Sequence, residues 1–352
     1  MGAWSPFFRF TFSARLGFVF SSQPRYVARW YKFDEVVVSV LVTGATGYIG
    51  QALSERLQRD GQTAVLLSRH GRPLPVSGAS TQALDLASAS VSETLLQGVD
   101  TVYHLAGIAH TQAPAAAHDS VNHRATLALA VAAERAGVRT FVFLSSVKAM
   151  GTAATATPRQ EWEVSPPSDA YGRSKWAAEC ALRERFAASA MSVIVLRPAL
   201  VYGAAPKGNL KWLLRAARWG LPAPPVGGAR SMVALGDLVD LLVCVPRCGL
   251  QGVSTFNVTD GHSYSARESF LILRAALGKP CLGYYWAVWL WRSLAGLLDL
   301  LQRQPRGASY DRLFGAERYD NHALLEATGW RPSATLASLA PAMARRADKV
   351  GL

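Results

Sequence analysis

Cysteine is scarce in this sequence, and the cysteines form no pattern typical of a metal site or a disulfide scaffold. The four of them, Cys180, Cys244, Cys248 and Cys281, make no CxxC pair and have no histidine at ligand spacing. Secreted disulfide scaffolds need many closely spaced cysteines, and zinc sites need paired ones. We therefore expect free thiols, a reducing cytoplasmic location and no metal site.

Hydrophobic runs long enough to cross a bilayer, which takes about 20 residues, are also missing. The most apolar stretch, CLGYYWAVWLWRSLAGLLDLL at 281–301, is interrupted by Arg292 and Asp299. We expect a helix over Tyr285–Leu301 that packs within the fold. The alternative interpretation is a helix that lies on a membrane surface as a peripheral contact.

Acidic residues are under-represented, with 24 Asp and Glu against 37 Lys and Arg, for a net charge of +13. This excess predicts an anionic ligand or surface nearby. The basic residues are scattered, with no run longer than two, which argues against nucleic acid as the partner. Half of the residues are hydrophobic and 17% are charged, a composition typical of a folded enzyme.

The first 35 residues carry five basic residues against Asp34 and Glu35. Arginines interrupt the apolar residues, so the segment is a poor secretory signal and only faintly resembles a transit segment. We expect residues 1–35 to be a disordered extension outside the fold.

A glycine-spaced turn follows an apolar, β-branched run that begins at Val36. The segment TGATGYIG at 43–50 places Gly44 at a tight turn, Gly47 where backbone N–H groups could approach a pyrophosphate, and Gly50 where a helix packs against a strand. The helix N-terminus would add oriented donors for the phosphates. A glycine-rich turn without a ligand has the same spacing, so this motif alone is ambiguous.

Strands and helices alternate beyond this turn. The pattern predicts strands at 63–67, 101–105, 140–144 and 191–196, a short strand ending at Asp85-Leu86, and helices at 88–97, 120–136 and 170–187. Such alternation indicates an α/β fold with a doubly wound parallel sheet. Ligands of such sheets bind beyond the carboxyl ends of the strands, where we expect Thr43, Ser68, Asp85, Ala106 and Ser146.

Proline interrupts the alternation after Gly203. We expect a nucleotide-binding domain at 36–203 to which 233–260 returns, and a smaller, partly helical substrate lobe made of 204–232 and 261–352.

Tyr171 and Lys175 lie four residues apart in YGRSK, on one face of the predicted helix. Free tyrosine has a pKa of about 10, and a nearby cation would lower it, making the phenol a usable acid and base. Ser146 could donate a hydrogen bond to a substrate oxygen that gains charge. Tyr171 alone would fit a half-buried aromatic; with Ser146 and the glycine turn, catalysis is the better interpretation.

Together the motifs identify a family. The chain resembles an extended short-chain dehydrogenase/reductase of the nucleotide-sugar epimerase/dehydratase type from about Val38 to Ala344. The motifs are TGATGYIG at 43–50, Asp85-Leu86, HLAG at 104–107, Val121-Asn122, FLSSVKAMG at 143–151, YGRSK at 171–175, LRPALVYG at 196–203, Arg230 with Asp237, and GWRP at 329–332.

The resemblance implies a bound NAD(P), a catalytic triad of Ser146, Tyr171 and Lys175, and a UDP-sugar substrate. Implied cofactor contacts are Gly44, Thr46, Gly47, Tyr48, Ile49, Arg69, Asp85, Leu86, Leu105, Ala106, Lys175 and Pro198. Asn209 and Arg230 would hold the uridine or diphosphate, although Arg230 could also be a surface charge. A homodimer through the helices at 120–136 and 170–187 is a further implication.

Two departures from the family pattern narrow the activity. Val147 and Lys148 stand where dehydratases of this type carry an acidic pair, so a dehydratase is not expected. Ser68 and Arg69 end the second strand where an aspartate commonly binds the NAD ribose. Serine and arginine accommodate a 2′-phosphate, so we expect NADP(H) rather than NAD(H).

The segments SSVKAMG and KGNL, at 207–210, resemble the branch that builds bacterial O-antigen and exopolysaccharide. Our first hypothesis is an NADPH-dependent reductase at C4 of a UDP-4-keto-6-deoxy-N-acetylhexosamine. The alternative is a 4-epimerase of UDP-glucose or UDP-N-acetylglucosamine. A non-catalytic NADP-binding regulator on the same fold is a third possibility.

Overall fold

The structure, a computed structural model, describes residues 39–75, 77–88, 91–109, 113–151, 157–206, 208–280, 286–303 and 305–350. The predicted extension at 1–35, Lys207 and Cys281 lie outside these residues. Within the described ranges, no helix combines the length and the apolar character needed to cross a membrane.

The main sheet has seven parallel strands, as the alternating pattern predicts. They are β1 (Ser39–Thr43), β2 (Ala64–Ser68), β3 (Gln82–Ala83), β4 (Val99–His104), β5 (Thr140–Leu144), β6 (Ser192–Pro198) and β9 (Val253–Val258). Their order is β3-β2-β1-β4-β5-β6-β9. The order of the strands reverses between β1 and β4, which is where doubly wound sheets bind their ligands.

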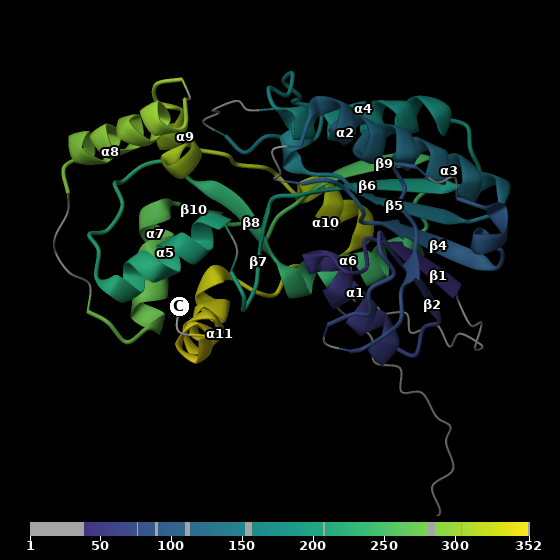
Figure 1. Cartoon of the computed structure of the whole chain (residues 1–352), viewed down its shortest axis with the longest axis horizontal. Helices are drawn as coiled ribbons and strands as arrows, with labels where there is room; N and C mark the ends of the chain where they lie inside the picture. Colours follow the sequence, from purple (N-terminus) through teal and green to yellow (C-terminus); the bar gives the residue numbers. More distant parts are fainter. Residues whose placement is uncertain are drawn as a thin grey trace, which may run out of the picture. The chain divides into compact units, whose positions relative to one another are not determined.

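Helices cover both faces of this sheet (Figure 1). One face carries α1 (Tyr48–Arg59), α6 (Leu235–Cys244) and α10 (His322–Thr328). The other carries α2 (Ala115–His118), the π-helical turn η2 (Asp119–Arg124), α3 (Ala125–Arg135) and α4 (Ala170–Arg185). The 3₁₀ turns η1 (Glu93–Leu96), η3 (Val147–Met150) and η4 (Val245–Arg247) complete this part of the chain.

Each face of the sheet has its own hydrophobic core. Leu53 of α1 and Leu241 of α6 join Val42 of β1 in one core. Leu129 of α3 and Leu182 of α4 join the second core on the opposite face. The strands are apolar on both faces because both faces are covered, which explains their nearly continuous hydrophobic sequences.

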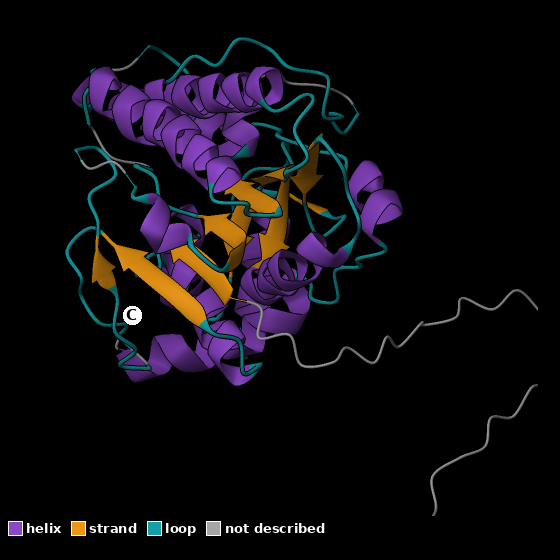
Figure 2. Ribbon diagram, turned by 90° about the vertical axis from the view of Figure 1, so that its right-hand side faces the viewer, coloured by secondary structure: helices purple, strands orange, loops and turns teal. Residues whose placement is uncertain are grey.

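A second, three-stranded sheet has the order β10-β8-β7. Its strands are β7 (Leu200–Tyr202), β8 (Arg230–Ala234) and β10 (Ser263–Tyr264). The helices α5 (Gly208–Trp219), α7 (Ala266–Ala276) and α11 (Leu336–Val350) surround a separate core that includes Leu214, Phe270 and Met343. Figure 2, turned by 90°, shows the helices and the sheets from the side.

The helices α8 (Val288–Leu301) and α9 (Ala308–Phe314) pack on each other as a hairpin. The carboxylate of Asp299 closes it, because its two oxygens accept hydrogen bonds from the backbone N–H groups of Gly307 and Ser309, each at 2.7 Å. The helix predicted over Tyr285–Leu301 is present, and it begins at Val288.

The predicted helix at 88–97 is wrong, since only the 3₁₀ turn η1 forms among the described residues there. Ser92 caps this turn by accepting a hydrogen bond from the N–H of Leu95 at 3.3 Å. Serine and threonine side chains compete for backbone partners in this way, which disfavours a regular helix.

The predicted helix at 120–136 begins earlier than expected, at Ala115, where Pro114 precedes the first turn. It also contains the π-helical turn η2 rather than regular α-helix throughout. Sequence pattern did not predict α10 or α11, and Pro341 inside α11 interrupts the helical signal.

Candidate active site

The glycine turn after β1 has the geometry that its sequence predicts. Gly44 has a φ of +70°, and a side-chain carbon there would lie 2.7 Å from the backbone nitrogen of Ala106. At Gly50 such a carbon would overlap the carbonyl oxygen of Gly44. Gly47 is the N-cap of α1 and has no side chain to cover the backbone donors of the first turn. The turn can therefore hold an anionic group at the helix N-terminus.

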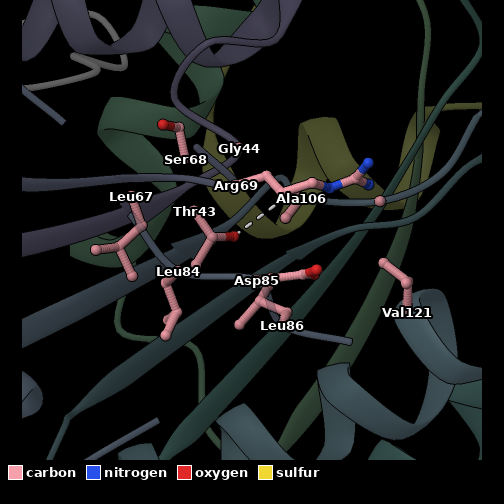
Figure 3. A pocket seen from close by; sticks show the side chains of 11 residues that line it. Thr43, Gly44, Leu67, Ser68, Arg69, Leu84, Asp85, Leu86, Ala106 and Val121 are labelled. Carbon is pink, nitrogen blue, oxygen red and sulfur yellow. Dashed lines mark hydrogen bonds between the residues drawn. The ribbon is translucent and has the colours of Figure 1, made fainter. Parts of the chain in front are cut away.

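A pocket opens beside this turn, at the carboxyl ends of β1, β2, β3 and β4 (Figure 3). Its lining is Thr43, Gly44, Leu67, Ser68, Arg69, Leu84, Asp85, Leu86, Ala106, Gly107 and Val121. Five of the predicted cofactor residues are among them, namely Gly44, Arg69, Asp85, Leu86 and Ala106. The fold thus brings together residues from four separate segments of the chain.

The remaining predicted cofactor residues are not among those that line the pocket. Thr46 and Gly47 belong to the glycine turn, Tyr48 and Ile49 begin α1, Leu105 precedes Ala106, and Pro198 ends β6. The Tyr48 hydroxyl lies so close to Gly203 that a side-chain carbon there would be 2.7 Å away. This close approach explains the glycine in the LRPALVYG motif.

Ser68 and Arg69 differ in how they meet the pocket. The Ser68 hydroxyl is buried and hydrogen-bonds the Thr81 hydroxyl at 2.6 Å, whereas Arg69 is exposed. In Figure 3 the Arg69 and Asp85 side chains extend in the same direction, away from the Ser68 hydroxyl. Arg69 rather than Ser68 is therefore the group available to an anion.

Ser146, Tyr171 and Lys175 meet at the carboxyl end of β5. Ser146 follows this strand and caps η3, where its hydroxyl accepts a hydrogen bond from the N–H of Lys148 at 3.2 Å. Tyr171 stands in the first turn of α4, and its side chain interacts with that of Ser146. The Lys175 ammonium donates to the carbonyl oxygen of Leu144 at 2.9 Å.

Burial controls the protonation of this group. It raises the pKa of Tyr171 to about 12, and the interaction with Ser146 opposes the rise. It lowers the pKa of Lys175 to about 8, against the charge of Glu179. The predicted lowering of the Tyr171 pKa by Lys175 is therefore wrong. Instead, the Lys175 ammonium is held by Leu144 and lies 4.6 Å from the centre of the Phe143 ring.

His104 organises the strand ends, a role that the sequence did not reveal. Its Nε2 lies 2.8 Å from the Thr126 hydroxyl, which itself donates to the carbonyl of Asn122. Nε2 is therefore the donor, and Nδ1 accepts from the Thr43 hydroxyl at 2.8 Å. Burial lowers the His104 pKa to about 3, so the ring is neutral and joins β1, β4 and α3.

Asn122 ties the loop after β4 to the helix that carries Tyr171. Its Oδ1 accepts from the Ile108 N–H at 2.8 Å, and its Nδ2 donates to the Ser174 hydroxyl at 3.0 Å. Asn122 lies in the π-helical turn, a distortion that often marks functional positions. The motif Val121-Asn122 pointed to this residue, but its partners come from the fold.

Lys148 and Glu317 connect the sheet domain to the C-terminal part of the chain. The Lys148 ammonium donates to both carboxylate oxygens of Glu317, at 3.0 and 3.1 Å. Arg230 lies 3.6 Å from the same carboxylate. The position that carries an acid in dehydratases is thus a lysine whose charge is already paired.

The two predicted substrate residues lie on different elements. Arg230 begins β8 and donates to the carbonyls of Gly315 and Asp311, at 3.2 and 3.0 Å, which holds the end of α9. Asn209 is exposed in the first turn of α5. Their contact with a substrate remains a prediction.

Comparisons with known proteins give the family. Residues 40–258 match the NAD dependent epimerase/dehydratase family. A UDP-glucose 4-epimerase from Vibrio cholerae is 31% identical over 313 residues, which cover 85% of this chain and 92% of the relative.

Two further comparisons agree. An N-acetyl-alpha-D-glucosaminyl-diphospho-ditrans,octacis-undecaprenol 4-epimerase from Escherichia coli O157:H7 is 28% identical and covers 68% of this chain and 73% of its own length. The structure of MoeE5 in complex with UDP-glucuronic acid and NAD is 26% identical, with a TM-score of 0.69 over 89% of this chain and 99% of MoeE5. The chain therefore belongs to the NAD dependent epimerase/dehydratase family and is an NAD(P)-dependent nucleotide-sugar enzyme.

Proposed function

We propose that this protein is a UDP-sugar 4-epimerase that acts on UDP-glucose or UDP-N-acetylglucosamine. The relatives from V. cholerae and E. coli are both named 4-epimerases, and the MoeE5 structure contains a UDP-sugar with NAD. The observation that carries the proposal is the position of Lys175, which is buried and donates to the carbonyl oxygen of Leu144 at the carboxyl end of β5. Its ammonium lies beside Gly107, which lines the same pocket as Arg69 and Asp85.

The residues at this edge fit a nicotinamide dinucleotide. Gly44 and Gly107 lack the side-chain carbon that would otherwise press on Ala106 and on Asn122, so the glycine turn and the loop after β4 can approach closely beside the pocket. The first turn of α1, which Gly47 caps, offers backbone donors for the diphosphate. Arg69 would bind a phosphate on the ribose.

Proton transfer at O4 is the task of Tyr171. When bound, NAD(P)⁺ would take the hydride from C4, and its positive charge would favour the Tyr171 phenolate. Tyr171 accepts the proton of the C4 hydroxyl as a ketone forms, and Ser146 donates a hydrogen bond to the ketone oxygen. Lys175 would bind a ribose hydroxyl of the cofactor. Inversion at C4 would result if the hydride returned to the opposite face of C4 while Tyr171 gave the proton back to O4.

Lys148 supports epimerisation over dehydration. Elimination of water requires an acid and a base beside the ketone, and the residue at the dehydratase position is an ammonium paired with Glu317.

Incubation with UDP-N-acetylglucosamine or UDP-glucose alone tests the proposal. We expect conversion to the C4 epimer without added nicotinamide, because the cofactor is regenerated in each turnover. The Ser146→Ala and Tyr171→Phe variants should lose this conversion. Turnover that depends on stoichiometric NAD(P)H would instead identify a reductase.

A C4 reductase of a UDP-4-keto-6-deoxy-N-acetylhexosamine is the second candidate. The favouring observation is the end of β2, where Arg69 is exposed and no carboxylate is present to grip a ribose diol. We propose NADP(H) as the cofactor on the same ground, since arginine stabilises a 2′-phosphate. The mass of the nucleotide that copurifies distinguishes NADP from NAD.

The group attached to the sugar diphosphate is a separate question. The E. coli relative is named for a substrate whose diphosphate joins N-acetylglucosamine to undecaprenol. Because the chemistry at C4 is the same with either group, we propose a polyprenyl diphosphate-linked N-acetylhexosamine as an alternative to the UDP-sugar.

A further inference from the structure

The helix α8 exposes an apolar face. Leu300 is 75% exposed, Leu301 72%, Trp289 64% and Leu297 53%. In the sheet domain, by contrast, the leucines of α1 and α4 are buried. A row of large apolar side chains left open over a whole helix is unusual for a surface that meets only water.

One stripe of α8 packs against α9. Trp291, Ala295 and Asp299 follow one another at intervals of four residues and form the packed stripe: Ala295 and Asp299 are buried, and the Trp291 ring lies 5.7 Å from that of Phe314. The Arg292 guanidinium lies 5.3 Å from the ring of Tyr310 on α9. Arg292 and Asp299 are the charged residues of α8. Asp299 is buried, and Arg292, although exposed, stands beside the packed stripe and next to Tyr310, so the opposite face with Leu297 and Leu300 carries no charge.

Cations and tryptophans stand at the ends of this face. Trp286 and Trp289 lie at the N-terminal end, and the exposed Arg303 and Arg306 occupy the loop that follows the C-terminal end. Tryptophan prefers the boundary between water and lipid, and arginine is attracted to anionic headgroups. The net charge of +13 acts in the same direction.

We propose that α8 docks this protein on an anionic lipid bilayer, lying in the plane of the headgroups with its apolar face inward. At 14 residues the helix is about 21 Å long, too short to cross the bilayer. The uncharged outward face and the flanking arginines match an anionic bilayer, which offers both an apolar layer and negative charge. A second copy of the chain, itself positively charged, offers no such complement.

Docking would bring the substrate side of the protein to the membrane. The helix α9 packs on α8, and Arg230 donates to the carbonyl oxygens at the end of α9. A diphosphate-linked sugar held in the bilayer by a lipid would therefore approach Arg230 from the docked side. This consequence rests on the proposed function, whereas the docking itself does not.

Co-sedimentation with vesicles tests the docking. The full chain is mixed with vesicles of phosphatidylcholine alone, or of phosphatidylcholine and phosphatidylglycerol in equal parts. We expect binding to the anionic vesicles that weakens at high salt. The Leu297→Glu/Leu300→Glu variant should bind about tenfold more weakly or worse, because two charges would enter the apolar layer.

A matched control separates the apolar face from net charge. Gln58→Glu/Gln97→Glu adds the same two charges at exposed positions of the sheet domain and should reduce binding far less. Equal losses in both variants would overturn the proposal. Wild-type protein that stays in solution with both kinds of vesicle would also overturn the proposal. A change from dimer to monomer in the Leu297→Glu/Leu300→Glu variant, measured by analytical ultracentrifugation, would then identify the apolar face as a contact between copies of the chain.

Activity on a water-soluble UDP-sugar, measured on the same samples, keeps the two proposals apart. The Leu297→Glu/Leu300→Glu variant should retain this activity, because α8 lies outside the catalytic residues. Vesicle binding without epimerase activity would contradict the proposed function and leave the docking intact. Epimerase activity without vesicle binding would contradict the docking and leave the proposed function intact.

Discussion

Two regions of the molecule have an unusual distribution of polar and apolar residues. The carboxyl edge of the main sheet buries polar groups, whereas the α8–α9 hairpin exposes apolar ones. At the sheet edge, Lys175 is 4% exposed and His104 is fully buried. On α8, the apolar Leu300 and Trp289 are the exposed groups. Soluble proteins mostly bury leucine and expose lysine.

The difference shows two ways in which a fold gives up stability for function. A buried lysine is costly unless hydrogen bonds replace its water, and the Leu144 carbonyl does so for Lys175. An exposed apolar helix gains nothing from water and remains available to an apolar partner. Under the two proposals, the sheet edge serves chemistry and α8 serves contact with a partner.

The largest expected effect breaks the chemistry of the sheet edge. Tyr171→Phe removes the proton carrier, so kcat should fall by about 10²- to 10⁴-fold while the protein stays folded. Tyr103→Phe is the matched control, because Tyr103 is a buried tyrosine of β4 outside the pocket. A Tyr171→Phe protein that remains active in the epimerase assay would remove Tyr171 from the mechanism.

A matched pair of leucine substitutions sharpens the contrast between the regions. Leu182→Ala in α4, at a fully buried position, should lower the free energy of unfolding by about 3 kcal/mol. Leu300→Ala in α8 should change it by no more than about 0.5 kcal/mol, because the side chain is already in water. Urea denaturation measures both. A large loss for Leu300→Ala would mean that α8 supports the fold.

The cofactor preference depends on a single exposed charge. Arg69→Ala should weaken NADP(H) binding about tenfold and leave NAD(H) binding nearly unchanged, because only the former presents a 2′-phosphate. Isothermal titration calorimetry with both nucleotides gives the ratio, and Arg72→Ala controls for loss of a nearby exposed charge. Equal losses for both nucleotides would contradict the role assigned to Arg69.

The last prediction concerns the pH dependence of stability. The pKa of Lys175 falls from 10.5 to about 8 in the folded protein, so the unfolded chain holds this proton to higher pH. The contribution of Lys175 to the unfolding free energy should therefore rise between pH 8 and 10.5, by at most about 1.4 kcal/mol per unit.

Comparison with Lys175→Met isolates this contribution. The variant should lack the rise, whereas Lys211→Met on α5 should keep it. Denaturation curves measured across the alkaline range provide the comparison. Parallel pH profiles for the wild type and Lys175→Met would show that Lys175 is not buried as described.

Local signals in the sequence were sufficient for the sheet and for the catalytic edge. Apolar runs and the glycine spacing predicted the strands, and strand ends of a parallel sheet necessarily meet at one edge. That rule predicted that Ser146 lies at the same edge as the glycine turn. The prediction of a helix at 88–97 was wrong because serine and threonine side chains compete for the hydrogen bonds of its backbone.

Contacts between distant segments were beyond the reach of the sequence. Lys148 pairs with Glu317, 169 residues further along the chain, and no local period encodes such a pairing. The partners of His104 depend in the same way on how β1, β4 and α3 assemble.

The sequence by itself therefore determined the fold class, the family and the positions of Ser146, Tyr171 and Lys175, because these depend on periodicity and motif spacing. The tertiary structure decided the direction of the Tyr171 pKa shift, the engagement of Ser68 by Thr81 and the exposure of α8. Burial causes all three, and burial is a property of the packed chain rather than of any segment within it.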